Sequence, residues 1–579
     1  MVFELLDGRN GSRVGTARRR GRALAAILLA LAGLTGTRLA AQDRPSAPDL
    51  VVLNARIYTA DPGRPRAEAL AVTRGRLVLV GSRLEVEALV GPRTDVWDLG
   101  GATVIPGMVD AHAHLVSLGT ALRTVDLVGT RSYDEAIARV VERARSVPPG
   151  SWIEGRGWDQ NDWSATAMPT LEPLSRAVPN HPVYLSRIDG HAALVNAMAL
   201  ERAGITRDTP DPAGGSIFRN PDGTPTGVLL EDNAKDLVRR VIPPPTPREL
   251  EDRILLAIGT ANENGLTGIH DAGVGADTIA VYRSLAQQGR YSLRNYVMIS
   301  AADSALTRLL REGPQLGVYD RLWVRSIKVS ADGALGSRGA FLLAPYTDAP
   351  DTRGLLLASR DSLKRVAALA LDHGFQMNVH AIGDGANRAV LDAYEDALRE
   401  HPTADHRFRI EHAQILSPDD IPRFARLGVI PAMQGSHQTS DMYWAVDRLG
   451  YARAVGAYAW RSLLDSGVII PNGSDFPVEF VNPLISFAAF VSRQDRDGWP
   501  PGGWFAAQRT TRDEALYSMT LWPAMAAFME EDTGSLSPGK FADFVVLDRN
   551  IMEIPVEQIY QTRVLRTVVG GSTVFQVAD

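Results

Sequence analysis

Two histidines separated by one residue, at the end of a short apolar strand, are the first side chains in this chain that could do chemistry. Within residues 104–114 a Pro-Gly turn precedes the strand, and the side-chain period of two along a strand places Asp110, His112 and His114 on one face. Imidazole is a common neutral ligand of zinc-like metals, so the pair could chelate one cation. Two hydrogen-bonded core histidines are the alternative, and the motif alone leaves it open.

A lysine in a second predicted strand could supply a ligand of another kind. Ser326, Lys328 and Ser330 alternate with the residues between them, which directs Lys328 into a barrel lumen if this strand is an inner one. Burial disfavours the ammonium form and lowers the pKa of a lysine. A neutral amine can add carbon dioxide, and the two oxygens of the resulting carbamate can bridge two cations. An unmodified Lys328 paired with Asp332 is the alternative.

Two further histidines are expected on neighbouring strands. Residues 375–384 alternate apolar side chains with Gln376, Asn378 and His380, and such polarity inside a barrel strand indicates a site rather than packing. His412 follows at the distance of one strand–helix unit. Either histidine alone could be a hydrogen-bonded core residue, but the interval favours a pair.

A carboxylate completes the set. The apolar strand at residues 468–473 leads to Asp475, which could bind a metal or act as a general base. An isolated Asp after a strand is more often a helix cap. The combination is more specific than any member, because all these side chains fall at predicted strand ends in one consistent order.

The element pattern between residues 107 and 529 predicts the scaffold for these side chains. Short apolar strands alternate there with amphipathic helices, which indicates parallel βα units. Candidate strands end near His114, Asp271, Ser300, Asp332, Asp384, Gln414, Gln434 and Asp475. Eight such strands predict an α/β fold, a (β/α)8 TIM-type barrel, whose chemistry lies at the C-terminal ends of the strands.

Two further structural units are predicted around the barrel. Short β-like segments separated by Gly, Pro and Asp turns fill residues 49–106 and return in residues 530–579, so both terminal segments are expected to form one small β-sandwich. About 150 residues separate the first two barrel strands, far more than one crossover helix needs. Residues 150–246 are therefore predicted to be an insertion over the barrel mouth.

The N-terminus has the order of a secretory signal. Arg18, Arg19, Arg20 and Arg22 precede an apolar run at residues 23–34, and small and polar residues follow. The run is shorter than the roughly 20 apolar residues of a spanning helix. We expect residues 1–41 to be removed and the mature protein to be exported, periplasmic or secreted, with no stable membrane span. An uncleaved anchor is the alternative.

The composition narrows the classes of function. The chain has 579 residues, a formal net charge of −6 and no cysteine, which excludes disulfides, thiolate nucleophiles, iron–sulfur clusters and Cys-ligated zinc. Lys and Arg are scattered rather than clustered, so no nucleic-acid partner is expected. A small-molecule substrate is expected instead, and a homo-oligomer stays open.

The ordered ligand set resembles that of the amidohydrolase superfamily. The set is His112, His114, Lys328, His380, His412 and Asp475, and the resemblance extends from about residue 49 to the C-terminus. Other motifs are similar to the branch of metal-dependent hydrolases that includes N-substituted formamide deformylase: Gly157-Trp158-Asp159, Asp189-Gly190-His191, residues 331–338 and residues 380–384.

The resemblance implies roles for these residues. His112 and His114 would bind a more buried metal, and His380 and His412 a more exposed one. Lys328 would bridge two divalent ions, expected to be zinc, as its carbamate. A metal-bridged hydroxide would attack an amide, N-formyl or N-acyl group, and Asp475 would contact the buried metal and pass a proton to the departing nitrogen.

Expectations for the substrate and for the remaining histidines are less direct. Five residues are expected to contact the substrate: Trp158, Asp159, His191, His270 and Arg338. Histidines in predicted loops or helices are expected at the surface: His181, His373, His401, His406 and His437. A mononuclear deaminase or cyclic amidase, with an unmodified Lys328, and a catalytically silent binding protein are the alternative functions.

Overall fold

The computed structural model describes residues 47–578, apart from residues 161–162, 164–166, 188–191, 213–214 and 337. The predicted signal at residues 1–41 and the predicted substrate contact His191 lie outside the described residues. In this described part, none of the helices combines the length and apolar character that crossing a bilayer requires.

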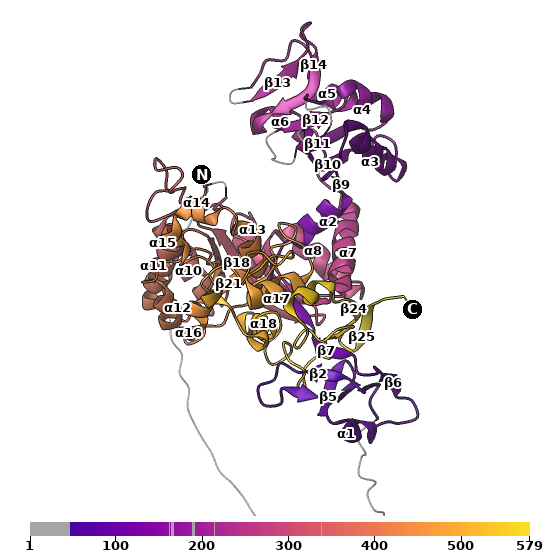
Figure 1. Cartoon of the computed structure of the whole chain (residues 1–579), viewed down its shortest axis with the longest axis vertical. Coiled ribbons are helices and arrows are strands. Elements are labelled where there is room, and N and C mark those ends of the chain that lie inside the picture. Colours follow the sequence, from indigo (N-terminus) through magenta and orange to yellow (C-terminus); the bar gives the residue numbers. More distant parts are fainter. Residues whose placement is uncertain are drawn as a thin grey trace, which may run out of the picture. The chain divides into compact units, whose positions relative to one another are not determined.

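Eight parallel strands form the barrel and pair with one another in chain order. They are β8 (Met108–Ala113), β15 (Leu266–Val274), β16 (Arg294–Ser300), β18 (Leu322–Ser330), β19 (Gln376–Ala381), β20 (Arg409–His412), β21 (Ile430–Gln434) and β22 (Asn472–Gly473). Two of them, β18 and β21, are labelled in Figure 1, with helices around them. The backbone N–H of Asp475 donates to the carbonyl oxygen of His112 at 2.8 Å, which joins the end of the last strand to the first. The predicted TIM-type barrel is confirmed.

Helices between the strands supply the outer layer of the barrel. Their bounds are α7 (Pro247–Glu263), α8 (Ala276–Gln287), α9 (Leu306–Glu312), α10 (Arg360–Asp372), α11 (Asp384–Glu400), α12 (Ile421–Leu427), α16 (Trp460–Asp465) and α17 (Pro483–Ser492). Helix α11 buries Val390, Leu391, Tyr394 and Ala397, the spacing of one helix face. Because all eight strands run in the same direction, their carboxyl ends meet at one rim, where catalytic groups of this fold lie.

Two sheets built from both ends of the described chain form the separate β unit. One contains β5 (Arg76–Gly81), β4 (Ala69–Thr73), β1 (Leu50–Leu53) and β6 (Asp95–Asp98); the other contains β25 (Ser572–Gln576), β24 (Val564–Val569), β23 (Phe544–Leu547), β7 (Thr103–Pro106), β2 (Arg56–Tyr58) and β3 (Arg66–Ala67). Strand β23 pairs antiparallel with β7. Val52, Val104 and Phe544 share one buried core, so the N-terminal and C-terminal segments stabilise each other.

The long segment between β8 and β15 folds around its own six-stranded sheet. The strands are β13 (Ser216–Arg219), β14 (Pro225–Leu230), β12 (Ala192–Val195), β11 (Val183–Arg187), β10 (Ile153–Trp158) and β9 (Val125–Asp126), with helices α3 (Tyr133–Arg145), α4 (Leu171–Ala177), α5 (Ala197–Ala203) and α6 (Glu231–Arg239). The unit therefore begins earlier than the predicted boundary at residue 150. The sequence did not indicate β9, because this strand has only two residues and shows no alternation of its own; it is a strand because it pairs with β10.

Candidate metal centre

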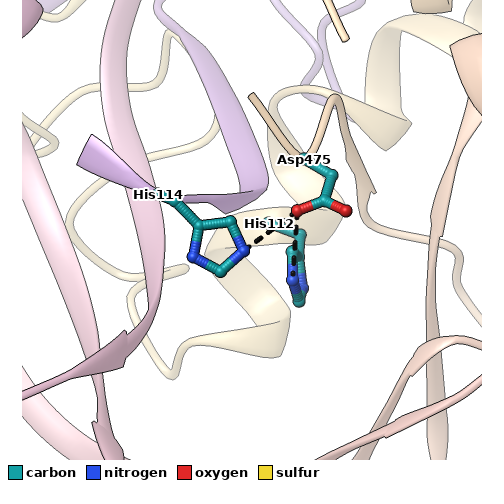
Figure 2. Close-up of side chains that lie close together, drawn as sticks. All are labelled: His112, His114 and Asp475. Carbon is teal, nitrogen blue, oxygen red and sulfur yellow. Dashed lines mark ion pairs between the residues drawn. The ribbon is translucent and has the colours of Figure 1, made fainter. Parts of the chain in front are cut away.

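The first and last barrel strands bring three of the predicted ligands together. His114 Nε2 lies 3.0 Å from Asp475 Oδ1, and His112 Nε2 lies 3.7 Å from the same oxygen, as Figure 2 shows. Asp475 has a φ of +59°, a left-handed conformation that is uncommon outside glycine. Its backbone is held there by the hydrogen bond to His112, so the carboxylate is fixed against the two imidazoles.

The other predicted ligands lie beside these three. The rings of His380 and His412, from adjacent strands, have centroids 4.5 Å apart, and the ring of His412 is 4.8 Å from that of His112. Lys328 Nζ lies 3.3 Å from His112 Nε2. The structure thus brings all six side chains to one part of the rim, while their role as metal ligands stays a prediction.

Hydrogen bonds on the far side of three imidazoles fix which nitrogen faces the centre. In each case an oxygen that can only accept lies at Nδ1, so Nδ1 carries a proton and Nε2 is the nitrogen that faces the centre. The acceptors are the Glu411 carboxylate for His112, the Ala272 carbonyl oxygen at 3.0 Å for His114, and Gln434 Oε1 at 2.8 Å for His412. A neutral histidine in this tautomer is ready to bind a cation.

Burial keeps most of these groups in the uncharged form that metal binding or carbon dioxide addition needs. It lowers the pKa of His112 and of His412 well below the ordinary value, and the pKa of His380 to about 4. Burial also lowers the pKa of Lys328. The neutral amine is thereby easier to form here than in an exposed lysine.

His114 and Asp475 behave as an ion pair when no cation is bound. Burial alone would raise the pKa of Asp475, but the close contact with His114 and the nearby His112 and His412 hold it well below its ordinary value. Burial alone would lower the pKa of His114, but the close contact with Asp475 and the charge of that carboxylate raise it. Asp475 is therefore a carboxylate, and a cation would have to displace the proton of His114.

The centre has buried polar atoms that lack hydrogen bonds. Within the described residues, Asp475 Oδ1, His380 Nε2 and His437 Nε2 make none, although Asp475 Oδ1 lies at ion-pair distance from His114. Leaving such an atom unpaired costs about 1–3 kcal/mol. A divalent cation would compensate this cost.

The donor atoms are also close enough to share cations. Two groups have donor atoms that all lie within 4.8 Å of one another: His112, His114 and Asp475, and His412, His437 and Asp475. Imidazole nitrogens and carboxylate oxygens are ligands that zinc and similar ions prefer. The residues at the rim therefore fit a divalent metal.

Two residues that the sequence analysis passed over hold His112 in place. Glu411 is fully buried between His112 and Arg409, and Arg409 Nε lies 2.8 Å from Glu411 Oε1. Arg409 also donates to the carbonyl oxygen of Ala111 at 2.7 Å. The alternation of β20, which places Arg409 and Glu411 on one face, is the signal in the sequence that could have indicated them.

Asp110 has a structural role next to the ligands. Its carboxylate accepts hydrogen bonds from the backbone N–H of Ser474 at 3.0 Å, from Ser474 Oγ at 2.6 Å and from the backbone N–H of His112 at 3.1 Å. Burial raises the pKa of Asp110 to about 7. Asp110 thus ties the first strand to the turn that carries Asp475.

The surface prediction is wrong for two histidines. His437 is buried on the first turn of α13 (Gly435–Asp441), its ring stacks on that of His412 with centroids 5.8 Å apart, and its Nε2 lies 3.8 Å from Asp475 Oδ2. His181 is also buried, with Nδ1 3.1 Å from the Ser151 carbonyl oxygen. A helix that starts directly after a barrel strand directs its first turn into the rim, which a helical pattern alone does not reveal. His373, His401 and His406 are half-buried.

Two predicted substrate contacts have structural partners within the insertion. Trp158 is fully buried in the core of that unit, and its Nε1–H donates to the Leu185 carbonyl oxygen at 2.8 Å. Asp159 forms an ion pair with Arg187 at 2.5 Å. A buried indole with its N–H paired has a packing role, and a substrate contact of Trp158 stays a prediction.

The two predicted substrate contacts outside the insertion also differ from expectation. His270 is buried, accepts a hydrogen bond from Arg409 at 2.8 Å and lines a cavity together with Phe541 and Asp543, residues of the C-terminal segment. Arg338 pairs with Asp348 at 2.8 Å. Neither side chain is among the groups that meet at Asp475, and a substrate contact of either residue stays a prediction.

Comparison with known proteins agrees with the fold and this centre. Residues 95–575 match the model of the amidohydrolase family. Putative amidohydrolase YtcJ of Bacillus subtilis (strain 168) is 34% identical over 527 residues, which covers 90% of this chain and 98% of that protein. N-substituted formamide deformylase of Arthrobacter pascens is 30% identical over 550 residues, covering 90% and 97%.

A solved structure supports the same class. An uncharacterized metal-dependent hydrolase from Pyrococcus furiosus superposes with a TM-score of 0.73 and 29% sequence identity, over 87% of this chain and 100% of that one. The fold and the centre define a hydrolase of a metal-dependent class. This chain belongs to the amidohydrolase family, as the ordered ligand set predicted.

Proposed function

We propose that this hydrolase cleaves a carbon–nitrogen bond of the amide, N-formyl or N-acyl type in a small organic molecule. The observation that carries the proposal is a set of three imidazoles, those of His112, His114 and His412, whose Nδ1 atoms are hydrogen-bonded to acceptors outside the centre. Their Nε2 atoms therefore face one ionised carboxylate, that of Asp475. The relative from Arthrobacter pascens is named for deformylation of N-substituted formamides, which supports a bond of this class.

We further propose that the centre holds two zinc ions. His112, His114 and Asp475 would hold one, and His380, His412 and a carboxylated Lys328 would complete the other. The 3.3 Å approach of Lys328 Nζ to His112 and the lowered pKa of the amine support the modification. Divalent zinc bound there supplies Lewis acidity, which lowers the pKa of a water molecule and polarises a carbonyl oxygen.

The side chains of the protein would carry the proton. As a carboxylate, Asp475 accepts a proton from the attacking water, a new C–O bond forms, and the proton then passes to the departing nitrogen as the C–N bond breaks. One water is consumed, and a carboxylic acid and an amine are released. Glu411 keeps His112 in its tautomer, and Asp110 holds the turn before Asp475, so neither has to reorganise during the reaction.

Metal analysis together with turnover tests this function. Protein purified from zinc-supplemented cells is expected to contain about two zinc ions per chain, to lose activity towards a panel of formanilides and acetanilides on chelation, and to regain it with zinc. One ion and an unmodified Lys328 would favour the mononuclear alternative. Protein without stoichiometric metal, whose activity chelators leave unchanged, would contradict the proposal.

We also propose that the enzyme is exported and that the insertion covers the barrel mouth. The arginine-rich and then apolar order of residues 1–34 supports export. N-terminal sequencing of the protein from its native host is expected to begin near Gln42. A soluble cytoplasmic form that retains Arg18–Arg22 would contradict export.

A further inference from the structure

One buried imidazole at the centre has no role in the reaction proposed above. His437 is only 9% exposed, and within the described residues its Nε2 makes no hydrogen bond. A buried polar atom without a partner is costly. A reason for its position is therefore needed.

The backbone that carries His437 is held firmly. The N–H of Gly435 donates to Asn472 Oδ1 at 3.1 Å, and the N–H of Ser436 donates to Ser486 Oγ at 3.3 Å. A Cβ on Gly435 would come within 2.6 Å of the Ser486 carbonyl oxygen, so the start of α13 packs directly against α17. His437 is thus presented to the rim by a rigid support rather than by a loose loop.

His437 faces the oxygen of Asp475 that the first-strand histidines do not face. Its Nε2 lies 3.8 Å from Oδ2, whereas His112 and His114 lie on the side of Oδ1. The ring planes of His437 and His412 differ by only 17°, which fixes the direction of the Nε2 atom. A shift of roughly 0.7 Å would bring Nε2 and Oδ2 to hydrogen-bond distance.

A second polar group stabilises α13 one turn further on. Asp441 follows His437 by four residues and therefore lies on the same helix face. It accepts hydrogen bonds from Gln414 Nε2, at 2.9 Å, and from the Tyr458 hydroxyl. These bonds anchor the face of α13 that carries His437.

We propose that His437 is a positioning residue of the hydrolysis, which holds Asp475 Oδ2 by a hydrogen bond. The inference rests on the proposed function, because only a carboxylate that transfers a proton needs this orientation. The O–H bond of water breaks and an Oδ2–H bond forms; later the Oδ2–H bond breaks and the proton joins the departing nitrogen. His437 donates the same N–H throughout and keeps its own protons.

The test compares variants of the zinc-loaded protein. His437→Phe keeps the stacked ring but removes the nitrogen, and His437→Gln places an amide N–H near the same position. The probes are p-nitroacetanilide, for the carbon–nitrogen bond, and p-nitrophenyl acetate, an activated ester. We expect His437→Phe to lower kcat by about tenfold or more on both probes, with KM within about twofold and unchanged zinc content. His437→Gln is expected to recover part of the loss.

The outcomes separate this inference from the proposed function. An unchanged kcat for His437→Phe, or a Gln variant no better than Phe, overturns the inference. Loss of zinc with activity also overturns it, and makes His437 a metal ligand. Turnover of the ester but not of the anilide contradicts only the proposal that the enzyme cleaves a carbon–nitrogen bond. The effect of the His437 substitutions on kcat can then still be measured with the ester. Turnover of neither overturns both. Circular dichroism checks the fold, and His437→Leu replaces the Phe variant if the larger ring does not fit.

Discussion

Two of the buried polar clusters among the described residues differ in whether their hydrogen bonds are complete. Away from the ligand rim, Arg294 donates to both oxygens of Asp543, at 2.5 and 2.8 Å, and lies over the ring of Phe541 at 3.6 Å. At the rim, atoms of Asp475, His380 and His437 are buried without hydrogen bonds. Both clusters are buried, and of the two only the second has atoms without hydrogen bonds. Such atoms beside imidazole and carboxylate donors are consistent with a place for a cation.

The largest loss of activity is expected for a substitution of Asp475, in the cluster whose hydrogen bonds are incomplete. Asp475→Asn removes the charge and the proton acceptor while keeping the shape, so we expect kcat to fall by about 10³-fold or more. Steady-state kinetics of zinc-loaded protein with p-nitroacetanilide measures this. A variant that keeps more than a tenth of the wild-type kcat would show that Asp475 does not carry the proton.

The opposite result is expected at the complete cluster. Asp543→Asn leaves Arg294 buried without its charged partner, which costs about 3–5 kcal/mol of the free energy of unfolding, while the kcat of the folded protein stays unchanged. Urea unfolding and kinetics measure the two quantities. The matched control is the double variant Arg294→Met with Asp543→Leu, which is expected to recover much of the stability. A large change in kcat with unchanged stability would contradict a purely structural role for the Arg294–Asp543 cluster.

A smaller effect is expected for Glu411, which contacts His112 on the side away from the other ligands. Glu411→Gln keeps a hydrogen-bond acceptor for His112 but removes the charge, and we expect zinc affinity to fall about 10- to 100-fold. Competition with a chelator measures the affinity. Activity is expected to return in excess zinc, and a loss that zinc does not restore would mean that Glu411 has another role.

The smallest effect is a dependence of metal affinity on pH. The ion pair with Asp475 raises the pKa of His114, and zinc binds only the deprotonated ring. Affinity should therefore be independent of this group above that pKa and fall about tenfold per pH unit below it. Titration calorimetry at several pH values measures this. In Asp475→Asn the pH at which zinc affinity begins to fall should be lower. If that pH is unchanged, protonation of His114 is not the cause of the pH dependence.

Much of the rim was predictable because strand geometry is simple. Side chains with a period of two, on strands that run in the same direction, must meet at one edge, so His112, His114, Lys328, His380 and His412 could be grouped without coordinates. Trp158 could not be assigned in this way. A tryptophan in a polar, Gly-rich sequence looks the same whether it faces a substrate or the core of its own small unit.

The position of His437 is the clearest example of a feature that the sequence alone did not predict. The order and spacing of apolar and polar residues already predicted the barrel and the convergence of six side chains, since these follow from local periodicity and from the direction of the strands. The family was indicated by the resemblance of the ordered ligand set. Only the tertiary structure decided that the first turn of α13 enters the rim, that Glu411 and Arg409 support His112, and that Asp475 offers its two oxygens to different neighbours. Those facts depend on how elements distant in sequence pack against each other, which no local pattern encodes.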